Sequence, residues 1–393
     1  MAREDSQDSG SINPLVARGV AIAPTWVAMT LGKERQHILR FVYFALALKP
    51  RVMPDSQPWT AADIPDLSGK VAIVTGGNAG IGEISVMELA RHGAKVYLAA
   101  RSPTRAQESL GRLKKQLEPA DFARIVWLPL DLADLESVKA AVEEFESKEN
   151  KLHILMNSAG VMATPYSFTK QGLELQNGTN VVGHALLTFM LLPTLVRTSR
   201  DPTLDGSVRI TNTSSVGHAE FGSGHPKQSW ASIETVNARQ GRETFGTWRR
   251  YGMSKTGNVL LASQLKKITA GERISHISLH PGNIDTDLFR GFKQSMPWMK
   301  PLFPALDWLI SKTLLTPAQG ALTQLYAATS PEVDTKHLNG AYLEPIAKLS
   351  KAAKHATGEA GDKLGAEMIT FIKSFAKSSV GVDIDQLITR ALA

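Results

Sequence analysis

Cysteine is absent from the sequence of 393 residues, and so are internal repeats, low-complexity tracts and apolar runs long enough to span a bilayer. A chain without cysteine has no disulfide bond, no thiolate metal site and no cysteine nucleophile, although this absence is neutral about the compartment. Histidines and carboxylates do not recur at metal-ligand spacing either, so no metal is predicted. The length allows one large domain or two smaller ones, each with a substantial buried core.

Basic residues outnumber acidic ones by 44 to 37, which gives a net charge of +7. A basic surface can attract nucleic acid. Here, however, Lys and Arg are scattered along the chain, and no aromatic-basic module accompanies them. We therefore predict no nucleic-acid partner, and we attribute the charge to an anionic cofactor and a solvated surface.

Residues 1–66 are predicted to form an N-terminal extension that ends in a Pro-containing linker. The acidic start MAREDSQDSG argues against a mitochondrial presequence or a secretory signal, so we expect a cytoplasmic protein. Two apolar stretches within residues 19–48 are each shorter than the ~20 residues that a transmembrane helix needs. They fit a helix that packs on the main domain or on a partner subunit, and they also fit a membrane-surface anchor.

From Lys70 onward, short apolar runs alternate with helical stretches. This order predicts an α/β fold, with a parallel sheet covered by helices on both faces. The predicted strands are 70–75, 94–100, 124–130, 152–157, 207–213, 273–279 and 340–345. The predicted helices include 80–92, 135–146, 171–196, 251–267 and 317–328. The Lys-rich stretch after about 346 is expected to form surface helices, and its sequence assigns it no role.

A glycine-rich turn follows the first predicted strand in VAIVTGGNAGIG. Gly76, Gly80 and Gly82 would permit a tight turn and let the backbone approach a pyrophosphate at the positive end of the next helix. A lone glycine triplet is also compatible with a strand-helix turn that binds nothing. The strand before it and the helix after it favour a dinucleotide site.

The end of the second predicted strand bears on the choice of cofactor. A site for NAD(H) usually places Asp or Glu there to bind the ribose hydroxyls, but this chain has Ala100 followed by Arg101. A guanidinium can grip a 2′-phosphate by paired hydrogen bonds, so NADP(H) is favoured. The alternative is that Arg101 is only a solvated cap of the strand.

A tyrosine and a lysine stand one helical turn apart in WRRYGMSKTGN. Tyr251 and Lys255 would project from one face of a helix, where a cation within ~4–6 Å lowers the pKa of a phenol towards neutrality. Such a phenol can donate a proton to a carbonyl oxygen, or accept one in the reverse direction. The alternative is that the two side chains merely decorate a helix.

These motifs, with five others in the right order, resemble the short-chain dehydrogenase/reductase family over about Leu67 to Pro345. The glycine motif has the family's TGxxxGxG form from Thr75 to Gly82, and YGMSK has its YxxxK form. In NSAG, Ser158 replaces the second Asn of the family's NNAG. The other matches are Asp131 after the third strand, Asn180 in NGTNVVGHALLT, Ser215 in ITNTSSVGH, and the PGxxxT segment with Pro281, Gly282 and Thr286.

The resemblance implies a single Rossmann-type, doubly wound parallel sheet of about seven strands. The NADP-binding catalytic domain would cover residues 67–345, and a helical C-terminal extension would cover 346–393. The cofactor contacts that the family pattern implies are Gly76, Asn78, Gly80, Ile81, Gly82, Arg101, Asp131, Asn157, Ala159, Gly160, Tyr251, Lys255, Pro281, Gly282 and Thr286.

The resemblance also implies a catalytic scheme. Tyr251 would be the general acid/base, and Ser215 would hydrogen-bond the reacting oxygen of the substrate. Lys255 would hold the nicotinamide ribose, and Asn180 would support a proton path through water. Ser214 competes with Ser215, but the family's serine is the second of such a pair, and strand alternation would place Ser215 just past the carboxyl end of the strand.

Three histidines near these motifs are given structural roles. His153 lies in a predicted buried strand and His280 precedes a proline, so both are expected to be satisfied structural residues. His184 lies one turn beyond Asn180 and is expected to contribute packing.

Within the family, the chain looks most like the retinol-dehydrogenase-like branch, whose members generally act on lipophilic carbonyls or alcohols. Residues 217–250 and 287–315 would form the substrate pocket, and the second segment is rich in Phe, Trp, Met and Leu. We expect a homo-oligomeric oxidoreductase that converts a hydrophobic ketone, aldehyde or secondary alcohol. Two other classes stay open: a non-redox enzyme on the same fold, such as a cyclase, dehydratase or epimerase, and a nucleotide-sensing interaction protein.

Overall fold

The computed structural model of the chain describes residues 59–221, 229–241, 243–284 and 314–393. The predicted N-terminal extension, with its alternative as a membrane anchor at residues 19–48, lies almost entirely outside the described residues. So do Thr286 and nearly all of the apolar segment 287–315. Of the described helices, none by itself is long and apolar enough to cross a bilayer.

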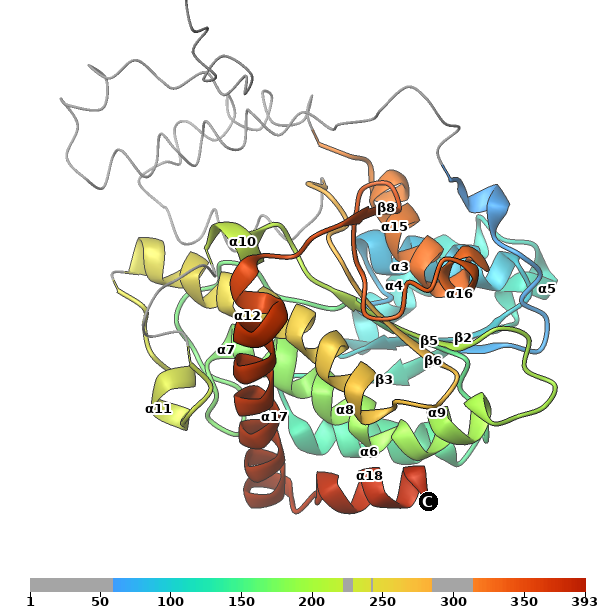
Figure 1. Cartoon of the computed structure of the whole chain (residues 1–393). Coiled ribbons are helices and arrows are strands. Elements are labelled where there is room, and N and C mark those ends of the chain that lie inside the picture. The colour runs from blue at the N-terminus through green and yellow to red at the C-terminus, as the bar shows by residue number, and fades with distance from the viewer. Residues whose placement is uncertain (1–58, 222–228, 242, 285–313) are drawn as a thin grey trace, which may run out of the picture. The chain divides into compact units, whose positions relative to one another are not determined.

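An eight-stranded sheet forms the centre of the described residues, in the order β3-β2-β1-β4-β5-β6-β7-β8 (Figure 1). Strands β1 to β7 pair in parallel, and β8 adds to β7 as an antiparallel edge. The strands are β1 (Val71–Thr75), β2 (Lys95–Ala100), β3 (Ile125–Pro129), β4 (Ile154–Asn157), β5 (Val208–Thr213), β6 (Ile274–Leu279), β7 (Tyr342–Glu344) and β8 (Lys348–Ser350). The predicted α/β fold is therefore confirmed. The strand missing from the prediction is β8, because a three-residue Lys-Leu-Ser strand gives no apolar pattern.

Alternating side chains of the central strands enter two separate cores, because helices cover both faces of the sheet. In β1, Ala72 and Val74 belong to one core, whereas Val71 and Ile73 belong to the other. The first face is covered by α3 (Gly80–Arg91), α4 (Pro103–Lys114) and α15 (Pro317–Thr329). The second face is covered by α6 (Leu135–Glu146), α8 (His184–Met190), α9 (Leu192–Ser199) and α12 (Glu243–Ile268). Shorter elements complete the described chain: η1 (Ala61–Asp63), α5 (Pro119–Phe122), α10 (Gly217–Glu220), α11 (Ile233–Val236), α16 (Glu332–Thr335) and η4 (Lys354–Ala356).

Two helix predictions need correction. The stretch predicted as one helix over 171–196 is divided into α7 (Leu175–Asn177), the π-helical turn η2 (Gly178–Gly183), α8 and α9. The chain bends by 54° before α9, whose first turn contains Pro193, a residue without the N–H that would continue the helix. Helix α12 begins at Glu243, so Tyr251 lies inside a long helix rather than at its start.

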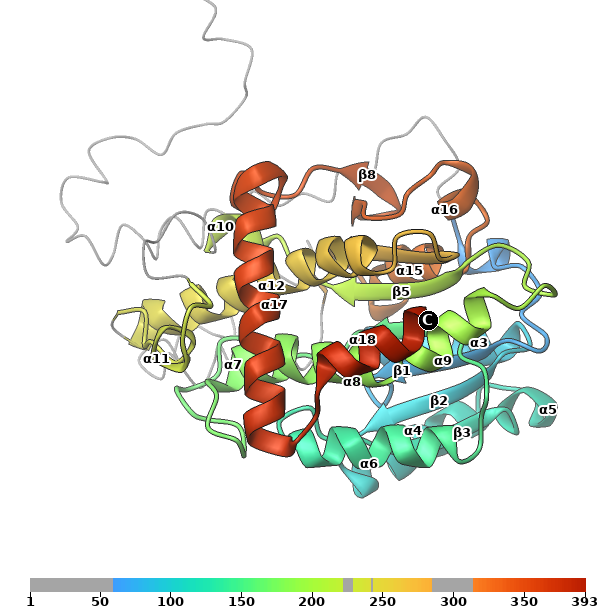
Figure 2. The same ribbon diagram turned by 60° about the horizontal axis from the view of Figure 1, so that its bottom comes forward.

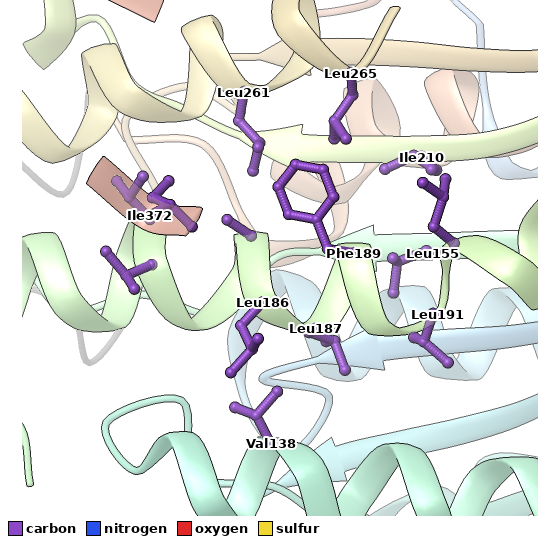
Figure 3. Packing of buried hydrophobic residues seen from close by; sticks show 14 of the residues in the cluster. Val138, Leu155, Leu186, Leu187, Phe189, Leu191, Ile210, Leu261, Leu265 and Ile372 are labelled. Carbon is purple, nitrogen blue, oxygen red and sulfur yellow. The ribbon is translucent and has the colours of Figure 1, made fainter. Parts of the chain in front are cut away.

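Phe189 of α8 lies at the centre of the larger core. Figure 3 shows its ring between Leu261 and Leu265 of α12 on one side and Leu155 of β4 on the other. Ile372, from the C-terminal tail, reaches the same cluster and is as fully buried as the others. The core is therefore assembled from segments that are far apart in the sequence.

The Lys-rich tail forms an outer layer, and one side of its helices is buried. Helix α17 (Gly358–Val380) packs across α12, and α18 (Ile384–Leu392) packs on α9 and α8 (Figure 2). Gly365 allows α17 to come close to α12, because a Cβ there would lie 2.5 Å from the Gln264 side chain. The prediction that the tail forms helices is confirmed, but only the outer side of these helices lies at the surface.

The substitution Ile372→Ala tests whether the tail is part of the core. It should lower the free energy of unfolding by about 2–5 kcal/mol, because it removes buried methyl groups and leaves a cavity. Thr370→Ala on the exposed side of the same helix is the control and should change the melting temperature little. A melting temperature equal to that of the wild type for Ile372→Ala would show that α17 contributes no core stability.

Candidate active site

The strand order reverses at the centre of the sheet, between β1 and β4. From β1 the chain builds outward to β2 and β3, and it then returns to place β4 on the other side of β1. The connections from the two strands leave in opposite directions, which opens a crevice at their carboxyl ends. In open α/β sheets this is the usual place for a ligand.

The glycine-rich loop after β1 brings two backbones together at this crevice. Gly76 has φ +68°, and a Cβ there would lie 3.0 Å from the Ala159 Cα at the end of β4. A Cβ on Gly82 would lie 2.3 Å from the Gly76 carbonyl oxygen, so α3 packs directly on the loop. Only glycine fits both positions without a shift of backbone.

Helix α3 begins at this loop with an uncapped N-terminus. Gly80 opens the helix with φ +53°, and no side chain caps its first turn. Unpaired N–H groups and the helix dipole suit an anion there. Asn78 and Ile81 belong to the same turn, and the Arg112 guanidinium donates to the Asn78 carbonyl oxygen at 3.2 Å. The residues present therefore fit the pyrophosphate of a dinucleotide.

Arg101 and Asp131 follow the carboxyl ends of β2 and β3, the two strands on one side of β1. Arg101 is exposed and forms no hydrogen bond or ion pair with the described residues. Asp131 is half-buried, and one of its carboxylate oxygens accepts the Ala133 N–H at 2.9 Å. The guanidinium is thus free to meet an anion, and Asp131 keeps a second oxygen for a ligand.

The NSAG segment after β4 is tied to β1 through the hydroxyl of Thr75. Thr75 Oγ1 accepts the N–H groups of Ser158 and Ala159, each at 2.9 Å, and lies 2.8 Å from His184 Nε2. His184 Nδ1 lies 3.0 Å from the Asn180 carbonyl oxygen. Burial lowers the pKa of His184 to about 4, so its neutral ring donates from Nδ1 to Asn180 and accepts from Thr75 at Nε2. His184, expected to supply packing, instead links the cofactor loop to the helix of Asn180.

The two asparagines that were assigned to the site both turn their side chains into the protein. Asn157 donates to Thr188 at 3.1 Å and to Asn212 at 3.0 Å. The cofactor contact predicted for Asn157 is therefore left to its backbone. Asn180 accepts the Val161 N–H at 2.8 Å and donates to the Val161 carbonyl oxygen at 2.9 Å, which fixes the chain just after NSAG.

Asn180 lies in the π-helical turn η2, a rare geometry that is frequent at functional sites. Its amide also donates to the Ser254 hydroxyl of α12 at 2.9 Å. A Cβ on Gly160 would lie 3.3 Å from Asn180 Oδ1 and 3.4 Å from Lys255 Nζ. The NSAG segment, η2 and α12 therefore meet at one point.

Ser215, Tyr251 and Lys255 come together beside this point. Tyr251 and Ser215 lie on the same side of Gly217, where a Cβ would be 3.1 Å from Tyr251 Cε1 and 3.5 Å from Ser215 Oγ. Lys255 Nζ lies 5.7 Å from the centre of the Tyr251 ring and donates to the Thr213 carbonyl oxygen at 2.8 Å. Tyr251 and Lys255 are each only 4% exposed, so water screens neither group.

The neighbouring serines Ser214 and Ser215 point in different directions. Ser214 is buried and donates to the Lys255 carbonyl oxygen at 2.7 Å. Ser215 Oγ accepts the Gly217 N–H at 3.1 Å and lies on the same side of Gly217 as the Tyr251 ring. Strand alternation at the end of β5 thus separates a structural serine from one that can meet a substrate oxygen.

Burial dominates the ionisation of the tyrosine and the lysine. It raises the pKa of Tyr251 to about 12, against a smaller lowering effect of the Ser215 hydroxyl. It lowers the pKa of Lys255 to about 7. The lowered pKa that the sequence predicts for Tyr251 is therefore not found in the protein alone, because the buried phenolate loses its hydration and the lysine carries only part of a charge at neutral pH. Tyr251 is a protonated phenol, which is the form that can donate.

The segment after β6 closes the site with backbone contacts. Pro281 is buried, and Gly282 has φ +98°, where a Cβ would lie 2.5 Å from Leu315 Cδ1. His280 Nδ1 accepts the Gly282 N–H at 3.4 Å, and burial lowers the pKa of His280 to about 3. Its environment is that of a neutral structural residue. His153 is similar, since its Nδ1 accepts the Val71 N–H at 2.9 Å.

Comparison with known proteins identifies the family. A model of the short chain dehydrogenases matches residues 70–225. An uncharacterized oxidoreductase of Schizosaccharomyces pombe is 42% identical over 294 residues, which cover 74% of this chain and 81% of the relative. A short-chain dehydrogenase/reductase of Armillaria gallica is 42% identical over 323 residues, which cover 81% of this chain and 95% of the relative. The chain belongs to the short-chain dehydrogenase/reductase family.

Solved structures agree with the fold of this short-chain dehydrogenase/reductase. An uncharacterized protein from Mycobacterium paratuberculosis matches with a TM-score of 0.59 at 26% identity, over 82% of this chain and 98% of that one. Levodione reductase matches with a TM-score of 0.54 at 20% identity, over 70% and 96% of the two chains. Membership of the family supports an oxidoreductase that uses a nicotinamide cofactor and a small-molecule substrate.

Gln324 of α15 belongs to the site of this short-chain dehydrogenase/reductase, although no motif contains it. It is fully buried, and its Nε2 donates to the Ile81 carbonyl oxygen at 3.1 Å and to Ser85 Oγ at 2.6 Å. Its Oε1 accepts from Ser158 Oγ at 3.0 Å and from Thr213 Oγ1 at 3.3 Å. Ser158, the departure from the family's NNAG, therefore has its partner on α15. The only signal in the sequence is the polar pair Thr323 and Gln324 within the otherwise largely apolar run GALTQLYAA.

The substitution Gln324→Met keeps the length of the side chain and removes all its hydrogen bonds. We expect a loss of at least about 1–3 kcal/mol in stability, because buried polar groups on α3, β5 and NSAG lose their partner. NADPH binding should weaken too, because the glycine loop loses an anchor. Ser158→Ala, which removes one of the four contacts, should lose less in melting temperature and in calorimetric NADPH affinity. Wild-type values for Gln324→Met would rule out this role.

Proposed function

We propose that this chain is an NADP(H)-dependent oxidoreductase that interconverts a lipophilic ketone or aldehyde and its alcohol, with Tyr251 as general acid/base. The observation that carries the proposal is the placement of Ser215 beside the buried Tyr251, which lies one helical turn from the buried Lys255. It lies beside the glycine loop that fits a dinucleotide. A bound nicotinamide would supply or take the hydride, and the protein would position the groups and move the proton.

The residues of the chain divide the proton chemistry between them. Tyr251 donates its phenolic proton to the carbonyl oxygen during reduction, and it accepts a proton from the alcohol during oxidation. Ser215 hydrogen-bonds the same oxygen and fixes its position. Lys255, when protonated, stabilises the phenolate that is left after donation. Asn180 binds the backbone of Val161, directly after NSAG, and so holds this turn close to Lys255. In members of the family, the proton path runs through this region.

The choice of NADP(H) over NAD(H) rests on Arg101. Its exposed guanidinium follows β2 directly, and an arginine can bind a 2′-phosphate by two hydrogen bonds. Ser102 caps the adjacent helix α4 by accepting the Arg105 N–H at 3.4 Å. The N-terminus of α4, which is the positive end of the helix dipole, therefore lies next to Arg101 and adds to the attraction for an anion.

An apolar substrate is supported by the aromatic surroundings of Tyr251. The Trp248 ring packs edge-on against the Tyr251 ring at 6.2 Å, and the Phe221 ring lies 5.3 Å from Trp248. Aromatic walls around a few polar groups are typical of sites for lipophilic ligands. The retinol-dehydrogenase-like branch and the homo-oligomer stay predictions, as does membrane contact through residues 19–48.

The substitution Tyr251→Phe should lower kcat for ketone reduction by about 10²–10⁴-fold, because it removes the proton donor. NADPH affinity should remain close to that of the wild type. Tyr342→Phe is the matched control: Tyr342 is also buried, and its hydroxyl has no partner among the described residues. Both variants are compared by following NADPH oxidation with a panel of apolar ketones and aldehydes. Full turnover by Tyr251→Phe would exclude this donor, and a wild type that binds NADPH without turnover would favour a non-redox enzyme.

The substitution Arg101→Ala should lower the ratio of kcat/KM for NADPH to that for NADH by about 10–100-fold. The expected range corresponds to the loss of hydrogen bonds to a charged group. Lys115→Ala, at the other end of α4, keeps Arg101 and should leave the ratio unchanged. A wild-type preference for NADH would contradict the assigned role of Arg101.

A further inference from the structure

The C-terminal tail contacts the chain between Ser215 and Tyr251. We give the name substrate segment to residues 217–221, 229–241 and 246–250, which lie between Ser215 and Tyr251 and whose side chains the structure describes. The tail touches the segment at two separate places, through Glu367 and through Ala353. No catalytic or cofactor motif of the chain lies in this tail.

Glu367 of α17 holds the middle of the substrate segment. Its Oε1 accepts a hydrogen bond from the Ser229 hydroxyl at 2.7 Å and another from the Trp230 N–H. Ser229 Oγ in turn accepts the Ala231 N–H at 3.0 Å. One carboxylate oxygen therefore fixes three successive residues of the segment.

Trp230 fills the space between α17 and α12. It is 1% exposed, and its ring centre lies 5.9 Å from that of Phe371, one turn beyond Glu367. On the α12 side, a Cβ on Gly257 would lie 3.3 Å from Trp230 Cζ2. Gly257 lies less than two turns beyond Tyr251 in the same helix. The indole ring therefore packs between α17 and α12, the helix that carries Tyr251.

The second contact reaches the backbone of the catalytic serine. His218 Nδ1 donates to the Ser215 carbonyl oxygen at 2.6 Å, and His218 Nε2 accepts the Ala353 N–H at 3.0 Å. His218 is buried against Tyr342, with 5.0 Å between the ring centres. The tail therefore supports the start of the substrate segment as well as its middle.

Helix α17 is itself held against α12, so it can act as a fixed support. Gly365, two residues before Glu367, permits the close approach to Gln264. An ion pair joins Asp362 to Lys267 of α12 at 2.5 Å. A support anchored this near to Glu367 leaves the carboxylate little freedom to move.

We propose that the tail supports the wall of the substrate pocket, and that Glu367 is a positioning residue for the selection of bulky substrates. This inference rests on the proposed function, because it takes the substrate segment as part of the pocket. Glu367 acts through Ser229 and Trp230 and touches no reacting group. Its loss should free the segment and weaken binding of a substrate that needs the fixed wall. The chemistry of Tyr251 and the binding of NADPH should stay intact.

The test compares Glu367→Ala with Glu367→Gln and with Lys363→Ala in the full-length chain. Gln keeps an oxygen that can accept both hydrogen bonds, and Lys363 is exposed on the same helix. Hydrogen exchange of the peptide containing Trp230 is followed by mass spectrometry. KM and kcat are measured with NADPH for the bulky ketone 2-decalone and for the small ketone cyclohexanone.

Glu367→Ala should speed exchange at Trp230 by about tenfold, since each lost hydrogen bond is worth a factor of several. It should raise KM for 2-decalone by a similar factor, while kcat for cyclohexanone and the Kd for NADPH stay at wild-type values. Glu367→Gln and Lys363→Ala should resemble the wild type. Unchanged exchange and KM in Glu367→Ala would overturn the proposal, and so would a Glu367→Gln variant as impaired as Glu367→Ala. A wild type that reduces neither ketone would count against the proposed function, and the exchange data would still decide whether Glu367 holds the segment.

Discussion

The contact between the end of β1 and the turn after β4 is the constraint on which the site depends. Thr75 binds two successive N–H groups of NSAG, and Gly76 lies against Ala159 with no room for a side chain. These two contacts hold together the backbone at the bottom of the crevice between β1 and β4. They also set the distance from the glycine loop to Lys255, because Gly160 follows in the same turn. A larger residue at Gly76 would separate the cofactor loop from the catalytic helix.

Burial gives the catalytic pair its chemical character. Exclusion of water raises the pKa of Tyr251 to about 12 and lowers that of Lys255 to about 7, so the two values, roughly half a unit apart in free amino acids, lie about five units apart in the protein. The phenol therefore keeps its proton in the protein alone, and a positive charge that arrives nearby would lower the cost of releasing it. The buried polar groups around the pair are held by fixed hydrogen bonds of the backbone, such as that from Lys255 to Thr213.

The sequence allowed the sheet, most of its strands and the main catalytic candidates to be predicted, because these depend on local patterns. Alternation along β5 separates Ser214 from Ser215, and helical spacing pairs Tyr251 with Lys255. The roles of Gln324 and Glu367 depend on partners more than one hundred residues away, which no local spacing encodes. The direction of the Tyr251 pKa shift failed for a similar reason: the degree of burial is set by the assembled core.

The position of α17 has a consequence for how the chain is made. Ile372 enters the same core as Val138, yet it leaves the ribosome after every strand of the sheet (Figure 3). During synthesis, part of the apolar surface of α8 and α12 therefore stays uncovered until α17 has been translated. A message with a premature stop after the last motif would encode every residue that we propose for catalysis, and would still release a protein with part of its apolar core exposed to solvent and to chaperones.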